Sequence, residues 1–94
     1  MLLVGLLKLN EFKKKHADVR GPVDAWCLEV QAADWKSPQC IKNRYRSADF
    51  LADNKVIFDI NGNRYRLLVK VNFERSIVVV EWIGTHSDYA KKKL

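Results

Sequence analysis

Side chains suited to phosphate chemistry stand in two short stretches of the chain, residues 63–66 and 86–89. An arginine such as Arg66 can hold a phosphate through two N–H groups and stabilise the charge that develops on a pentavalent phosphorus. A histidine such as His86 can move protons near neutral pH, and a tyrosine such as Tyr89 can hydrogen-bond a phosphate or stack on a base. Together these groups suffice for metal-independent RNA cleavage, in which a ribose 2′-hydroxyl attacks its own phosphodiester.

Each of these side chains also has a structural interpretation. His86 can cap or anchor the last helix, and Tyr89 can fill the edge of the core with its hydroxyl at the surface. Arg64 can simply pair with Asp59, and exposed ion pairs add little stability. Arg66 is the stronger functional candidate, because Arg64 has the nearer acidic partner.

A second group of candidates would contact the RNA backbone. Its members are basic or polar: Lys36, Lys42, Arg46, Asn63, Arg64 and Lys70. Lys42 and Arg46 are first of all a solvated helix face, because exposed charge needs no further explanation, and only second an RNA contact.

The charge of the chain agrees with an anionic partner. Seventeen lysines and arginines against eleven aspartates and glutamates give a formal net charge of +6 on 94 residues. Such a balance favours nucleic acid, and a strongly acidic protein partner fits the charge equally well.

No metal or cofactor is expected. Cys27 and Cys40 form no CxxC motif, the only histidines are His16 and His86, and no glycine-rich phosphate loop occurs. The apolar start at residues 2–7 is too short to cross a membrane, so we expect a cytoplasmic protein.

An Asn61-Gly62 hairpin organises the strands that carry the candidates. We expect a two-residue type I′ turn, because this pair favours positive φ at both central positions. Beyond it, strict alternation over residues 64–73 predicts one apolar core face and one largely cationic face. The turn then places Asp59 opposite Arg64.

The last strand, residues 77–84, is expected to continue the same two faces. Placing Trp82 opposite Leu67 puts the indole in the core. It also places Glu81 on the cationic face, diagonal to Arg66 and Lys70, where it can pair with Arg66.

The remaining elements complete an α+β chain in one domain, residues 1–94. We expect a short N-terminal strand, a helical hairpin with Asp18 as N-cap of its second helix, a three-stranded antiparallel meander and a short C-terminal helix. A further short helix starts at Ser37-Pro38, a polar connection tucks Phe50 under the sheet, and Thr85 caps the last helix.

Two segments carry a family resemblance, Gly62-Asn63-Arg64-Tyr65-Arg66-Leu67 and Gly84-Thr85-His86-Ser87-Asp88-Tyr89. Together with residues 12–16, 33–38 and 47–49, they resemble the HigB family of type II toxins in the right order over nearly the whole chain. The resemblance implies a RelE-like fold and ribosome-dependent cleavage of mRNA. It also implies a HigA antitoxin with a helix-turn-helix domain, in a hetero-oligomeric complex that binds operator DNA through the antitoxin. Carried over position by position, the family pattern points to Asn63, Arg64, Arg66, His86 and Tyr89, with Lys36 as a further candidate.

The chain departs from the family pattern at four places. Ala90 replaces the usual aspartate after the tyrosine and bears on how the last helix is anchored; Arg46 replaces a common proline, and Asp59 a common asparagine. The start at residues 5–7 is more apolar than usual and indicates either a partner surface or different N-terminal packing.

A second hypothesis belongs to another class of function. The chain can be a non-catalytic basic module that binds RNA or an acidic partner peptide, and composition does not separate this hypothesis from the toxin.

Overall fold

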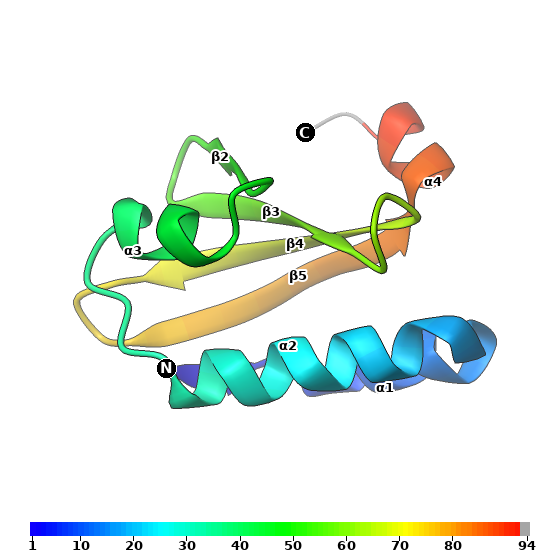
Figure 1. Ribbon diagram of the computed structural model, residues 1–94, viewed down its shortest axis with the longest axis horizontal. Helices are drawn as coiled ribbons and strands as arrows, with labels where there is room; N and C mark the ends of the chain where they lie inside the picture. The colour runs from blue at the N-terminus through cyan, green and yellow to red at the C-terminus, as the bar shows by residue number, and fades with distance from the viewer. Residues whose placement is uncertain (93–94) are drawn as a thin grey trace.

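One mixed sheet of five strands forms the centre of the computed structural model, which describes residues 1–92 (Figure 1). The elements in chain order are β1 (Leu2–Val4), α1 (Leu6–Lys15), the 3-10 turn η1 (Ala17–Val19), α2 (Arg20–Ala32), α3 (Pro38–Arg44), β2 (Asp49–Leu51), β3 (Lys55–Ile60), β4 (Tyr65–Asn72), β5 (Ile77–Thr85) and α4 (His86–Lys91). The strand order is β1-β5-β4-β3-β2; β1 runs parallel to β5 and the other pairs are antiparallel. The predicted α+β class is confirmed.

The core lies between the sheet and the α1–α2 hairpin, which covers one face (Figure 1). Apolar residues at helical spacing face the sheet, and alternate strand residues face the helices. Phe58 lies at the centre and packs against the rings of Trp26, Trp35 and Tyr45. We call this covered side the inner face and the opposite side the outer face.

The predicted polar connection between α3 and β3 is wrong in part. Asp49–Leu51 forms the edge strand β2, which pairs antiparallel with β3. Phe50 is 38% exposed and does not tuck under the sheet. A strand of three residues leaves little periodic signal in the sequence, because it is short and its side chains are mostly exposed.

The predicted N-cap of α2 is also wrong. Asp18 lies within η1, α2 begins at Arg20, and its N-cap residue Val19 makes no side-chain capping bond. The other capping prediction is confirmed, because the Thr85 hydroxyl accepts a hydrogen bond from the Asp88 N–H at 3.1 Å.

The hairpin loop is longer than the predicted two-residue turn. Asn61 and Gly62 do have positive φ, at 55° and 67°. The chain, however, turns through residues 61–64, and β3 pairs with β4 from Ile60 opposite Tyr65. Asp59 therefore lies opposite Arg66, and the predicted pairing with Arg64 is wrong.

A β-bulge shifts the register between β4 and β5. Val69 faces Val80, but Leu68 faces Trp82, with the irregularity between Leu68 and Val69. The extra residue on β5 turns Trp82 to the outer face, so its predicted place in the core is wrong.

The outer face is therefore mixed, and the prediction of a largely cationic face is wrong. Ile57, Leu68 and Trp82 form an apolar row across three strands, in which Ile57 is 0% and Leu68 5% exposed. Glu81 pairs with Lys55 at 3.2 Å, so the predicted pairing with Arg66 is wrong too.

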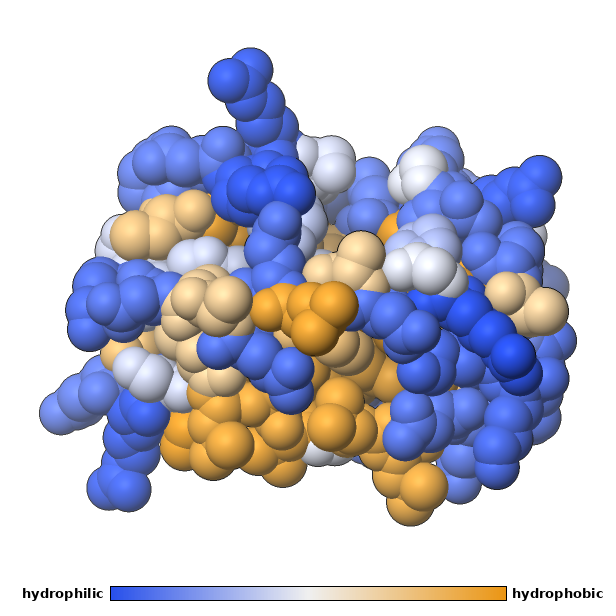
Figure 2. Space-filling view, turned by 60° about the horizontal axis from the view of Figure 1, so that its bottom comes forward, coloured by the Kyte–Doolittle hydropathy of each residue, from blue (hydrophilic) through white to orange (hydrophobic). Residues whose placement is uncertain are grey.

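Several apolar side chains of the two helices and the N-terminal segment lie at the surface, although Leu3 is buried. Leu7 is 70% exposed, and Leu28 of α2 is 69% exposed. Figure 2 shows apolar side chains gathered on the side of the molecule that bears α1 and α2. No helix within residues 1–92 is long and apolar enough to cross a membrane.

Candidate active site

Arg66 occupies the end of the sheet next to the hairpin loop and is held from several sides. Its Nε lies 3.1 Å from Asp59 Oδ1, and the Arg66 side chain is 10% exposed. Its Nη2 donates to Asn63 Oδ1 at 2.8 Å, and its Nη1 donates to the Asn63 and Tyr65 carbonyl oxygens at 3.3 Å. The guanidinium is therefore fixed before any ligand arrives, and ordering it adds no entropy cost on binding.

The start of α4 brings His86 and Tyr89 to the same end. The His86 N–H donates to the Arg64 carbonyl oxygen at 2.8 Å, which ties α4 to the hairpin loop. The Arg66 Cζ lies 6.0 Å from the centre of the Tyr89 ring, within cation–π range. His86 is exposed and Tyr89 is half-buried. We call Asn63, Arg64, Arg66, His86 and Tyr89 the hairpin-end cluster.

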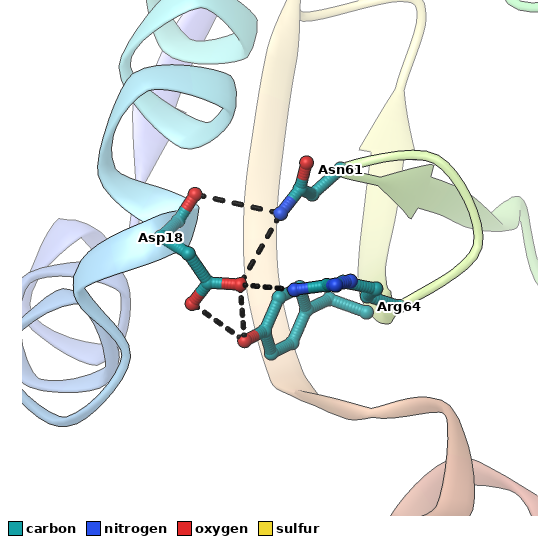
Figure 3. A network of polar contacts seen from close by, with 4 residues as sticks. Asp18, Asn61 and Arg64 are labelled. Carbon is teal, nitrogen blue, oxygen red and sulfur yellow. Dashed lines mark hydrogen bonds and ion pairs between the residues drawn. The ribbon is translucent and has the colours of Figure 1, made fainter.

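Asp18 fastens the hairpin loop to the helical layer (Figure 3). The Tyr65 hydroxyl donates to Asp18 Oδ1 at 2.7 Å, and Arg64 Nη1 and Asn61 Nδ2 both approach Oδ2 at 3.3 Å. Arg64 thus points toward η1, and its acidic partner is Asp18 in place of the predicted Asp59.

This network shifts two pKa values in opposite directions. The hydrogen bond from Tyr65, followed by contacts with Arg64, holds the pKa of Asp18 below its ordinary value of 3.8. The same hydrogen bond raises the pKa of Tyr65 above 10.0, because ionising the phenol would remove the donor beside a carboxylate.

The comparison with protein families agrees with this arrangement. The family model HigB_toxin, described as the RelE-like toxic component of a toxin-antitoxin system, matches residues 19–92. The chain belongs to the HigB toxin family. Comparison with curated proteins finds no match.

The residues that match the HigB family model include the whole hairpin-end cluster. The match begins at Val19 and runs past Tyr89, so it spans α2, the four antiparallel strands and α4. The five-stranded α+β architecture is consistent with the RelE-like fold. A toxin of this kind implies an antitoxin as its partner.

The other residues predicted to contact RNA lie apart from the hairpin-end cluster of this HigB-family chain. Lys36 is exposed and pairs with Asp34 at 3.0 Å, and Lys42 Nζ donates to the Ala48 carbonyl oxygen at 2.9 Å. Arg46 follows α3, which Figure 1 places at the other end of the sheet from α4. Lys70 is exposed on the outer face, opposite Lys55. The structure therefore brings together five of the nine sequence candidates.

Trp82 is the neighbour of the cluster that the sequence interpretation missed. Its ring centre lies 6.3 Å from that of Tyr89. Strict alternation assigned it to the core, and only the unusual Gly84 two residues later signalled a break in the packing. Among residues 1–92, no three His, Cys, Asp or Glu side chains gather closely enough to hold a metal ion.

Replacing Asp18 with asparagine is expected to destabilise the HigB-family fold in a pH-dependent way. Because the pKa of Asp18 is lowered in the folded state, its carboxylate stabilises the fold above pH 3.8, and this contribution is lost as the pH falls through the lowered pKa. The difference in unfolding free energy between wild type and Asp18→Asn should be constant at neutral pH and shrink below pH 3.8, measured by urea unfolding.

Asp24→Asn is the matched control, because Asp24 makes an exposed pair with Lys13 at 2.7 Å outside this network. It should change stability little at any pH. An Asp18→Asn effect that is equally large at pH 2.5 and pH 7 would contradict the role of the ionised carboxylate.

Proposed function

We propose that this HigB-family toxin is a metal-independent endoribonuclease that inhibits translation by cleaving mRNA on the ribosome. The observation that carries the proposal is the fixed Arg66 guanidinium 6.0 Å from the Tyr89 ring, at the sheet end where α4 begins with the exposed His86. A rigid cation, a phenol and an accessible imidazole at one end of the sheet can together catalyse phosphodiester transesterification.

The proposed reaction is an attack of a ribose 2′-hydroxyl on the adjacent phosphorus. The 2′-oxygen gives up its proton, the bond to the 5′-oxygen breaks, and that oxygen gains a proton. The products are a 2′,3′-cyclic phosphate and a 5′-hydroxyl. His86 and Tyr89 are the candidates for moving these protons, and either can also contact the phosphate.

Arg66 stabilises the extra negative charge of the pentavalent phosphorus. Its Nη2 currently donates to the Asn63 amide oxygen at 2.8 Å, so a phosphate oxygen replaces this neutral acceptor when the RNA binds. Asp59 keeps its place on Nε and holds the plane of the guanidinium. The exchange favours the anion, because charge-assisted hydrogen bonds are about twice as strong as neutral ones.

The remaining basic and polar candidates bind the RNA backbone on either side of the reacting phosphate. Asn63 and Arg64 lie in the loop next to Arg66, whereas Lys36, Lys42 and Arg46 lie toward the α3 end and Lys70 in between. The spread fits a substrate longer than one nucleotide, as expected for mRNA held by the ribosome. We propose that the protein acts in the cytoplasm, where translating ribosomes are present.

The partner in this proposal is a HigA-type antitoxin with a helix-turn-helix domain. It binds the toxin in a hetero-oligomeric complex and attaches that complex to operator DNA. If the antitoxin leaves Arg66 and His86 accessible to solvent in the complex, inhibition works by blocking entry to the ribosome; protection of both side chains would mean that it covers the site.

Expression in growing cells tests the proposal. Wild type should arrest growth, and the ends of cleaved mRNA should map to translating ribosomes. A soluble wild-type protein that binds ribosomes and cuts no transcript would instead favour a non-catalytic basic module for RNA or an acidic peptide.

A further inference from the structure

On the outer face, the Trp82 ring lies over Gly84, which has no side chain to displace it. A Cβ atom at position 84 would stand 2.3 Å from Cζ2 and 2.6 Å from Cη2 of the indole, so the ring occupies the space that any other residue would fill. Gly84 is in turn the cross-strand partner of Arg66. The indole therefore covers the backbone of the β5 residue that pairs with Arg66.

The groups around Trp82 form a row with one cation at each end and two aromatic rings between them. Arg66 lies 6.0 Å from the Tyr89 ring, Tyr89 lies 6.3 Å from the Trp82 ring at an interplanar angle of 40°, and Lys92 Nζ lies 5.3 Å from the Trp82 ring. Cations at both ends and aromatic rings between them suit a polymer that alternates phosphates and bases.

Trp82 also remains open to solvent, unlike the other tryptophans. Trp26 and Trp35 belong to the core and are only 3% and 5% exposed, whereas Trp82 is partly exposed to solvent. Trp82 is also among the residues of α1 and β5 that line a cleft of about 290 Å³. Lys8 and Lys15 line this cleft, together with the acids Glu11 and Glu81.

We propose that Trp82 is a stacking platform for a nucleobase of the RNA, next to the phosphate that Arg66 holds. This inference rests on the proposed function and adds a base-binding residue to it. Stacking on an indole tolerates any base, because every base has a π-face, so Trp82 contributes affinity and register without selecting a sequence. A purely structural Trp82 would only hold α4 through Tyr89.

Binding of a non-cleavable RNA separates the two roles. The probe is a 2′-O-methyl hexanucleotide of mixed sequence, and the readout is tryptophan fluorescence together with an independent affinity measurement. Trp82→Leu should bind about 10-fold more weakly than wild type, whereas Trp82→Phe, which keeps an aromatic ring, should stay within about 3-fold. Binding should quench wild-type fluorescence and leave that of Trp82→Phe nearly unchanged, because the other tryptophans are buried.

Gly84→Ala provides a second variant that retains the tryptophan but displaces its ring. It should weaken binding as Trp82→Leu does, while thermal unfolding reports any loss of α4 anchoring. Equal affinity of wild type, Trp82→Leu and Gly84→Ala would overturn the stacking role even if wild type cleaves mRNA. Failure of the wild type to cleave any mRNA would instead overturn the proposed function, whatever the affinities.

Discussion

Arg66→Ala is expected to lower mRNA cleavage by at least ~100-fold, which is the scale for losing one preorganised group that stabilises transition-state charge. The guanidinium is 10% exposed and already fixed by Asp59 and Asn63, so its loss removes a positioned cation that no mobile surface lysine replaces. Arg66→Lys should restore little, because an ammonium cannot keep the two-sided contact with Asp59 and a phosphate. Cleavage rates on mRNA-programmed ribosomes measure the effect.

A double variant tests whether Arg66→Ala loses cleavage only because the fold is less stable. Arg66→Ala leaves the half-buried Asp59 without its partner, which destabilises the fold. The double variant Asp59→Asn/Arg66→Ala removes both charges and should regain thermal stability. Recovery of cleavage along with stability in the double variant would contradict a catalytic role for Arg66.

His86→Ala is also expected to lower cleavage by at least ~100-fold, the scale for losing one proton-transfer group. The tie between α4 and the hairpin loop uses the backbone N–H of His86 and remains in the alanine variant, as does the Thr85 cap. The variant should therefore fold like wild type while it loses an exposed imidazole. Thermal unfolding and ribosomal cleavage assays measure both properties.

Chemical rescue distinguishes proton transfer from positioning at this residue. Because His86 is exposed, imidazole added to the assay can reach the empty place and should restore part of the activity of His86→Ala. Tyr89→Phe should not respond to imidazole. Full activity of His86→Ala without any addition would assign the proton transfer to Tyr89 or to a group outside the hairpin-end cluster.

The sequence was sufficient to predict most of the fold. Helical spacing identified α1 and α2, alternation identified β3 and β4, and the Asn61-Gly62 pair located the hairpin. Each of these signals arises from residues close together in the chain, so it can be read from the sequence alone. The strand β2 was not predicted, because three mostly exposed residues leave almost no such pattern.

The details of the candidate site depended on register, which the sequence predicted less well. The loop of residues 61–64 makes Arg66, and not Arg64, the cross-strand partner of Asp59. The bulge places Trp82 on the outer face and not in the core. A longer loop changes the cross-strand partner of every later residue, and a bulge also reverses the faces of the residues beyond it. The proximity of Arg66 and Tyr89 was still predictable, because the hairpin and the end of β5 lie at the same end of the sheet.

Ribosome-dependent mRNA cleavage is tested most simply with purified ribosomes programmed with one defined mRNA. Adding the wild-type protein without divalent cations beyond those of the ribosome buffer should give a cut that ends in a 2′,3′-cyclic phosphate and a 5′-hydroxyl. The cut should vanish when the ribose on the 5′ side of the scissile phosphate is 2′-deoxy. Cleavage that persists at the 2′-deoxy position, or the absence of any cut with a folded wild-type protein, would contradict the proposed reaction.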